Sequence, residues 1–342
     1  MHMLTPGDEE SLLLDIKEGI RYALYLGKQE GRFTEDEIHL DKIRLNKLQY
    51  IVNEDRDLGL TFGWFKYGPA PEDVTTDTGV ALSPQPGDDI AHLGESRLPS
   101  KDHLSTEAFA YYFLRELDDE FDRIVTAEET KVYLVDFYDK YAPKDEYAAR
   151  FTELYKASAR LQQTLDAIGD GRDWHQSSTE FYYGLDKKFL PVSEEIAKLD
   201  SLEHTLEPLE EYRKLLTSII SKADAKDELS SSQQAFINNA IRKFYNTVWD
   251  FVGQEISLET MRGENVDELR PKVETNTEKY RDGSWKAELD SLAERRESVG
   301  LDPEIEDMEK LESGGNGEDD EQSLDEEMVK RVSEMGAEVI SD

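Results

Sequence analysis

The sequence predicts a mainly α-helical protein with one minor β element and an acidic, disordered C-terminal tail. Three observations support this fold class. Apolar residues recur at spacings of three and four through most of the chain, which is the spacing of one face of an α-helix. One short segment, residues 58–70, mixes glycines with aromatic residues and favours an extended strand over a helix. Residues 300–342 hold too few apolar side chains to offset the entropy cost of folding.

Two helices are expected before the extended segment. Between residues 9 and 27, six apolar side chains form a single stripe: Leu12, Leu13, Ile16, Ile20, Ala23 and Leu24. Thr34, with Glu37 three residues later, has the pattern of a capping box. A second helix should therefore begin at Thr34 and end near Asp55.

A stretch rich in proline and glycine, residues 72–103, interrupts the helical pattern and is typical of a loop insertion. Helices resume at Ser105, whose hydroxyl can cap the first turn. A shorter helix should follow and end before Pro143. We therefore expect an N-terminal helical domain at residues 1–142, with the insertion inside it.

A strict seven-residue repeat comes next, with seam positions separated by alternating steps of four and three: Tyr147, Phe151, Leu154, Ser158, Leu161, Leu165 and Ile168. Such a repeat is typical of a supercoiled helix. A second helical stretch at residues 178–222, with breaks expected at Pro191 and Pro208, could complete an antiparallel helical hairpin. The seam at 147–168 could also hold a homo-oligomer together.

A long helix at about residues 231–261 has an apolar face wide enough for a buried central helix. Together with the helical hairpin it defines a second domain, residues 143–285. No aromatic residue occurs after Trp285. We assign residues 286–342 to an acidic linker and a disordered tail.

Acidic residues dominate the composition: 77 Asp and Glu stand against 40 Lys and Arg, which gives a net charge of −37. Residues 300–342 account for −13 of this charge, so the remaining −24 is spread over residues 1–299. In molar salt the Debye length falls to about 3 Å, and like charges then hardly repel each other. We therefore expect a salt-adapted, haloarchaeal-type acidic protein in a high-salt cytoplasm. The same charge disfavours binding to a nucleic acid without excluding it.

Features that the sequence lacks narrow the function classes. It has no cysteine, which excludes disulfides and thiolate chemistry. No apolar run approaches 18 residues, and the N-terminus lacks a basic region followed by an apolar one, so we expect a cytoplasmic protein without a membrane segment. No phosphate-binding glycine loop, HExxH or GxSxG pattern occurs. We expect no catalytic residue, no metal site and no cofactor.

The segment at residues 41–73 reads DKIRLNKLQYIVNEDRDLGLTFGWFKYGPAPED. It resembles the SocA-like, or Panacea, antitoxin-associated family, whose members have a KLQKLLY-type helix followed by a W-x-YGP element. The residues that carry the resemblance are Leu45, Lys47, Leu48, Tyr50, Trp64, Tyr67, Gly68 and Pro69. The resemblance implies an antitoxin-like role and a winged-helix-like shape for the first domain. In the family a helix follows the Gly-Pro turn, whereas here the insertion at 72–103 intervenes.

The aromatic turn in this segment is the candidate partner-binding surface: Trp64, Phe65, Lys66, Tyr67, Gly68 and Pro69. Three aromatic rings within four residues are costly to leave in water. Aromatic residues are also enriched where protein interfaces bind most strongly. The alternative is that all three rings face inward and form ordinary core.

Three function classes stay open. We favour a non-enzymatic protein-interaction or regulatory module, antitoxin-like in role, that binds a protein partner. The second class is a winged-helix regulator that binds DNA through a basic face formed by Lys42, Arg44, Lys47 and Arg56. The third is an enzyme with a carboxylate-bound metal ion, which no residue spacing favours.

Overall fold

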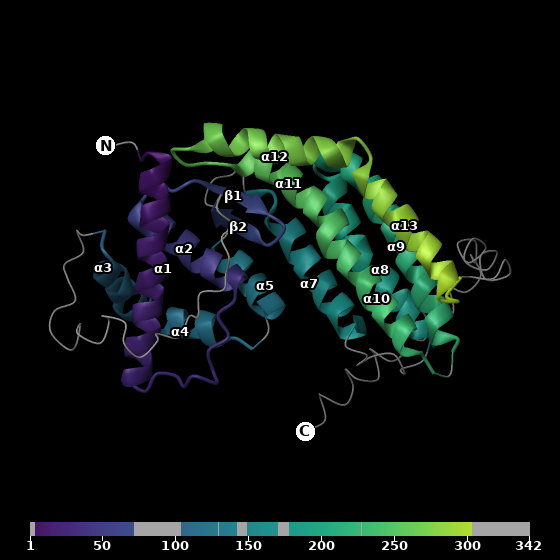
Figure 1. Cartoon of the computed structure of the whole chain (residues 1–342), viewed down its shortest axis with the longest axis horizontal. Helices are drawn as coiled ribbons and strands as arrows, with labels where there is room; N and C mark the ends of the chain where they lie inside the picture. Colours follow the sequence, from purple (N-terminus) through teal and green to yellow (C-terminus); the bar gives the residue numbers. More distant parts are fainter. Residues whose placement is uncertain are drawn as a thin grey trace, which may run out of the picture.

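The computed structural model describes residues 4–71, 104–128, 130–141, 149–169, 178–226 and 228–302. These residues form a mainly helical protein with a single two-stranded sheet, which confirms the predicted fold class (Figure 1). The predicted insertion at 72–103 and the predicted tail from residue 303 onward lie outside the described residues.

The first helix, α1 (Pro6–Gln29), follows the predicted apolar stripe. It begins at a capping box in which the side chains of Thr5 and Asp8 accept hydrogen bonds from each other's backbone N–H groups. Ile16 and Ile20 are fully buried. The helix therefore packs on the core along the face that the spacing predicts.

The second helix, α2 (Lys42–Arg56), begins later than the predicted start at Thr34. Glu37 does accept hydrogen bonds from the backbone N–H and the hydroxyl of Thr34, but the chain makes only a turn there. Asp41 caps the helix instead, because its carboxylate accepts a hydrogen bond from the N–H of Arg44 at 2.9 Å.

The predicted minor β element is an antiparallel hairpin of β1 (Phe62–Phe65) and β2 (Gly68–Pro71), with residues 66–67 in its turn. Gly68 has a φ of +79°, a conformation that residues with a Cβ rarely adopt. A Cβ at this position would also lie 2.8 Å from the ring of Tyr138. Glycine is therefore required where the second strand begins.

After residue 103 the chain re-enters the described fold at Ser105, whose hydroxyl accepts a hydrogen bond from the N–H of Ala108, as predicted. The elements that follow are α3 (Thr106–Tyr111), the π-helical turn η2 (Tyr112–Leu117), α4 (Asp119–Thr126) and α5 (Thr130–Lys140). α3 packs closely on α1 because Gly19 has no side chain. A Cβ on Gly19 would lie 2.5 Å from the Cβ of Phe109.

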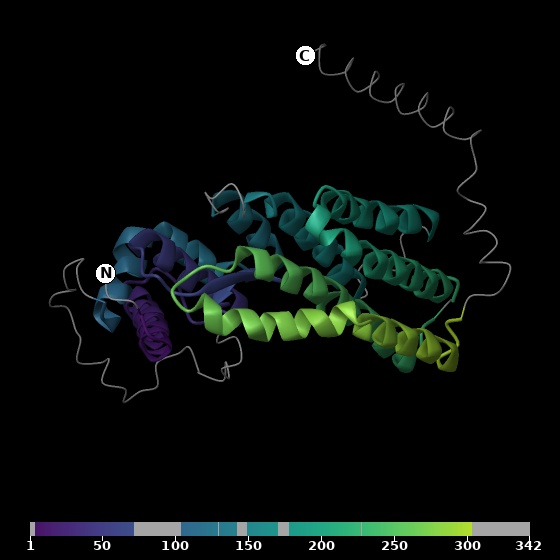
Figure 2. The same cartoon turned by 90° about the horizontal axis from the view of Figure 1, so that it is seen from above.

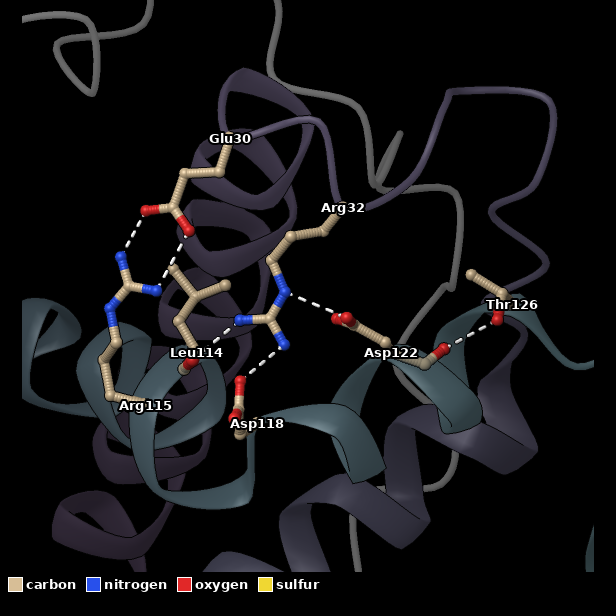
Figure 3. A network of polar contacts seen from close by, with 7 residues as sticks. All are labelled: Glu30, Arg32, Leu114, Arg115, Asp118, Asp122 and Thr126. Atoms are coloured by element: carbon tan, nitrogen blue, oxygen red, sulfur yellow. Dashed lines mark hydrogen bonds and ion pairs between the residues drawn. The ribbon is translucent and has the colours of Figure 1, made fainter.

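An arginine network joins the end of α1 to these short helices (Figure 3). The Arg32 guanidinium donates to the carbonyl of Leu114 at 2.7 Å and to the carboxylate of Asp118 at 2.8 Å. Its Nε donates to Asp122 at 2.9 Å. One side chain thus holds the end of η2 and the start of α4 against the loop that follows α1.

The rest of the described chain is a helical bundle. Its elements are α7 (Thr152–Gly169), α8 (Ser178–Ala197), the 3₁₀ turn η3 (Asp200–Thr205), α9 (Leu206–Asp224), α10 (Ser231–Lys243), the π-helical turn η4 (Phe244–Val248), α11 (Trp249–Thr260), α12 (Val266–Arg281) and α13 (Ser284–Ser298). α7 and α8 pack against each other as the predicted helical hairpin, and α10, η4 and α11 form the predicted long helix. In Figure 1, α12 crosses the upper end of this bundle and α13 lies beside α9.

The seven-residue repeat lies inside this bundle. Phe151, Leu154 and Leu165 are fully buried by the chain itself, where α7 packs against α5, α8 and α10. The seam positions from Phe151 to Ile168 are therefore covered within the chain itself, and a homo-oligomer through this seam stays a prediction. Tyr147, at the start of the repeat, lies outside the described residues.

The structure corrects two predicted helix limits. Pro191 lies within α8 without ending it, on a side exposed to solvent, whereas a break does occur just before Pro208. Residues 284–298, which the sequence assigns mostly to the acidic linker, form α13 and pack against α9. Leu289 and Leu292 are buried there, because leucines three residues apart lie on one helix face.

One continuous apolar core runs from Leu12 in α1 to Leu301 after α13. The predicted boundary between residues 142 and 143 does not separate two cores. A second, small apolar cluster lies where α11 and α12 meet: Met261, Leu269 and Val273.

Candidate functional site

A pocket of about 930 Å³ opens where the N-terminal helices meet α11 and α12. Its walls come from α1, α2, the turn of the hairpin, α11 and α12, so residues far apart in the sequence meet there. Pockets of this size hold a drug-sized molecule or a few side chains. This pocket is the candidate functional site.

The six residues of the predicted partner-binding turn divide between this pocket and the core. Four of them line the pocket: Phe65, Lys66, Tyr67 and Gly68. Trp64 is only 2% exposed, and Pro69 is also buried. The structure therefore corrects the prediction of one continuous surface for Trp64 and Pro69.

Strand geometry explains this division, because successive side chains of a strand point to opposite faces. Trp64 faces the main core, where its ring lies 5.2 Å from that of Tyr155 and 6.3 Å from that of Tyr50. Phe65 faces the other way and packs on the small apolar cluster that contains Leu269.

Buried donors hold the backbone of the turn. The Tyr155 hydroxyl shares its proton between the carbonyls of Trp64, at 2.9 Å, and Phe65, at 2.6 Å. The indole N–H of Trp249 donates to the carbonyl of Lys66 at 2.5 Å. The conformation of the turn is thus fixed from inside the protein.

Lys47, on α2, is the third of these donors. Its side chain is 1% exposed, and its ammonium donates to the carbonyl of Tyr67 and, at 3.0 Å, to that of Pro69. The ammonium also lies 5.3 Å from the centre of the Phe137 ring, but it forms no ion pair with a carboxylate in the described chain. Burial lowers the pKa of Lys47 well below its usual value, and the charge of Asp41 opposes this only in part.

The basic face expected for DNA binding does not form. Arg44 and Lys47 are each 1% exposed, and Arg56 is paired with Glu116 at 2.9 Å. The sequence did contain a signal of this burial: Lys47 lies three residues before Tyr50, on the helix face that the core covers.

We expect the wild-type protein to gain stability relative to Lys47→Met as the pH is raised towards the ordinary lysine pKa of about 10.4. The unfolded chain keeps a proton on Lys47 up to the ordinary pKa of about 10.4, whereas the folded chain releases that proton at lower pH. Between the two pKa values the unfolded state binds more protons, so stability rises with pH by up to about 1.4 kcal/mol per pH unit.

Denaturant unfolding of both proteins at several pH values measures this difference. Buried tyrosines also ionise at high pH, but they are common to both proteins and cancel in the comparison. A difference that stays constant as the pH is raised to about 10.4 would contradict a depressed pKa at Lys47.

Charged side chains of both signs line the pocket: Glu9, Glu10, Lys42, Lys47, Lys66, Asp250, Glu268 and Lys272. The protein itself already binds two of these carboxylates. Glu9 accepts hydrogen bonds from the hydroxyl of Thr61 at 3.0 Å and from the side-chain amide of Asn265 at 2.5 Å. Asp250 accepts one from the hydroxyl of Tyr280 at 2.8 Å. With four lysines in its walls, the pocket is far less negative than the chain as a whole, whose net charge is −37.

Two further features were searched for in the described part of the chain. No three His, Asp or Glu side chains are grouped there closely enough to hold a metal ion. None of its helices combines the length and the apolar character needed to span a membrane.

Comparison with curated proteins and with solved structures gives no match. A family model does match, over residues 69–334, which is most of the chain and includes the α11 and α12 walls of the pocket. Because the match begins within the hairpin, it neither supports nor contradicts the resemblance at residues 41–73. The chain belongs to the family described as "Domain of unknown function (DUF8098)".

Proposed function

We propose that this chain is a non-enzymatic protein-interaction module with a regulatory, antitoxin-like role, and that its pocket takes a segment of the partner. One observation carries the proposal. The side chains of residues 65–67 line the pocket, while three buried donors hold the backbone carbonyls of the same turn. Burying polar side chains costs desolvation energy. A turn that only connected two strands would not require three buried polar side chains.

Binding is favoured when the conformation of the binding surface is already fixed before the partner arrives. Phe65 and Tyr67 are half-buried, so they lose little conformational freedom when a partner covers them. Aromatic residues in such positions are typical of interface hot spots. Burial raises the pKa of Tyr67 to about 12, so its hydroxyl stays neutral at physiological pH.

A photo-crosslinking residue at position 67 tests this proposal. In cells that naturally make the protein, benzoylphenylalanine in place of Tyr67 should crosslink a protein partner. The control carries the same residue in place of Leu190, which is 55% exposed on α8 and does not line the pocket. The purified partner should then bind Tyr67→Ala about ten-fold or more weakly than wild type. If both positions crosslink only the same proteins, the pocket is not a partner site.

We further propose that the protein works in a high-salt cytoplasm, on the basis of its net charge of −37. We expect the melting temperature to rise between about 0.1 M and about 3 M KCl, and the fold to loosen below about 0.5 M, because salt screens repulsion between surface carboxylates. Circular dichroism and light scattering measure both effects. A melting temperature that does not depend on KCl would remove the argument for salt adaptation.

A further inference from the structure

Three helices begin at the pocket. The first turns of α1, α2 and α12 line it through Glu9, Lys42 and Glu268, respectively. In both overall views α12 begins beside the N-terminal end of α1 (Figure 1 and Figure 2), and the side-chain amide of Asn265 binds Glu9 across this junction at 2.5 Å. N-terminal helix ends carry partial positive charge and favour anions. Their convergence favours a negative charge on a ligand in the pocket, although the chain as a whole is strongly acidic.

Lys47 is a second and independent observation. It lines the pocket although its side chain is only 1% exposed. When it is charged, two of its three ammonium protons bind the carbonyls of Tyr67 and Pro69, and the third has no acceptor in the described chain. A buried ammonium without a counter-ion is unfavourable. A carboxylate on a ligand would supply both the missing acceptor and the missing charge.

Gln254, on α11, adds an unsatisfied acceptor to the same pocket. Its side-chain oxygen is buried and receives no hydrogen bond within the described residues. Such an atom is costly unless a donor reaches it, and an N–H group of a ligand is a suitable donor. The apolar part of the wall contains Phe65, Leu269 and Val273, which suits an apolar side chain.

We propose that the pocket binds the C-terminal residue of a partner chain, with its carboxylate at Lys47, its backbone N–H at Gln254 and an apolar side chain against Phe65. A chain end carries all three groups on one residue. A single carboxylate balances the single buried ammonium, whereas a phosphate would bring a second negative charge into a pocket that Glu10 and Glu268 also line. This inference rests on the proposed function, because it names the part of the partner that enters the pocket.

The first probe is N-acetyl-4-fluorophenylalanine, which is compared with its C-terminal amide in ¹⁹F NMR titrations of the full chain in about 2 M KCl. The acid has the carboxylate, the N–H and the ring, and the amide keeps the N–H and the ring but replaces the carboxylate with a neutral group of similar size. We expect the acid to bind about ten-fold or more tightly than the amide. A hexapeptide that ends in the same residue as a free acid should bind at least as tightly as the small acid.

Variants of the chain test whether the preference for the acid over the amide arises in the pocket. Lys47→Met should abolish the preference for the acid, but this change also removes two hydrogen bonds to the turn. Lys272→Glu is the second variant, because it reverses an exposed charge that lines the pocket on α12. It should weaken binding of the acid several-fold and leave binding of the amide unchanged. Lys279→Glu, also exposed on α12 but not lining the pocket, is the matched control and should change neither.

The titrations and the crosslinking experiment together distinguish a failure of this inference from a failure of the proposed function. Equal binding of acid and amide to the wild-type chain would overturn the inference, while a partner crosslinked through position 67 would still support the proposed function. Binding of the small acid without binding of the hexapeptide would also overturn it, because the site would then take a free acid. Tight binding of the hexapeptide with no partner crosslinked through position 67 would support the carboxylate site and count against the proposed function.

Discussion

Replacing Trp64 by alanine is expected to lower the free energy of unfolding by about 3–5 kcal/mol. The indole is 2% exposed, and its ring lies 5.2 Å from that of Tyr155, 6.1 Å from that of Tyr138 and 6.3 Å from that of Tyr50. These rings come from α7, α5 and α2, so alanine would leave a cavity that three separate helices would have to move to fill. Unfolding in denaturant, followed by circular dichroism, measures the loss.

Tyr67→Ala is the matched control from the same hairpin. Tyr67 is half-buried and lines the pocket, so its removal should cost on the order of 1 kcal/mol. Equal losses from the two substitutions would mean that Tyr67 belongs to the core as fully as Trp64 does. The pocket-facing role of the turn would then have no basis.

Helix starts were predictable from local signals, but not without error. Ser105 caps α3 as its place before an apolar run predicts. Glu37 accepts a hydrogen bond from the backbone N–H of Thr34, which is one of the two bonds of the predicted capping box, yet no helix begins there. These side chains can satisfy local backbone groups in a turn as well as at a helix start. The signal therefore identified the contact between Thr34 and Glu37 correctly and the secondary structure wrongly.

Two predictions that relied on charge were wrong, one about a helix and one about a buried side chain. Residues 284–298 look like a linker because they are highly charged, but Leu289 and Leu292 are enough to bury one face of α13. Lys47 looks like a surface residue because it is a lysine. Its ammonium instead donates to the carbonyl of Tyr67, twenty positions later, and a residue type alone does not reveal such a contact.

The pocket could not be predicted from spacing, because its walls meet across most of the chain. The backbone N–H of Trp64 donates to the hydroxyl of Thr260 at 3.1 Å, over a separation of 196 residues, and Phe62 pairs with Arg262 in an isolated β-bridge. Periodicity describes which face of an element is apolar, but not which distant element covers it. Only the aromatic turn was visible in the sequence as a candidate site.

Arg281→Met is expected to lower the free energy of unfolding by about 3 kcal/mol. The side chain of Glu255, on α11, is only 4% exposed, and Arg281 on α12 donates two hydrogen bonds to it at 2.6 and 2.5 Å. Removing one partner of a buried ion pair costs about 3–5 kcal/mol, because the other charge is left uncompensated. The lower end of this energy range applies here, since His204 still contacts Glu255 at 2.8 Å and the side chain of Arg281 is 51% exposed.

A double variant separates the uncompensated charge from the loss of packing by the arginine. Adding Glu255→Gln to Arg281→Met removes that charge, so the double variant should regain part of the lost stability. Lys279→Met, an exposed position on the same helix, is the control and should change the stability by less than about 0.5 kcal/mol. Urea unfolding of all the proteins in one buffer measures these differences. If glutamine lowers the stability further, the carboxylate is stabilised by contacts other than Arg281, and the ion pair between Arg281 and Glu255 does not hold α12 to α11.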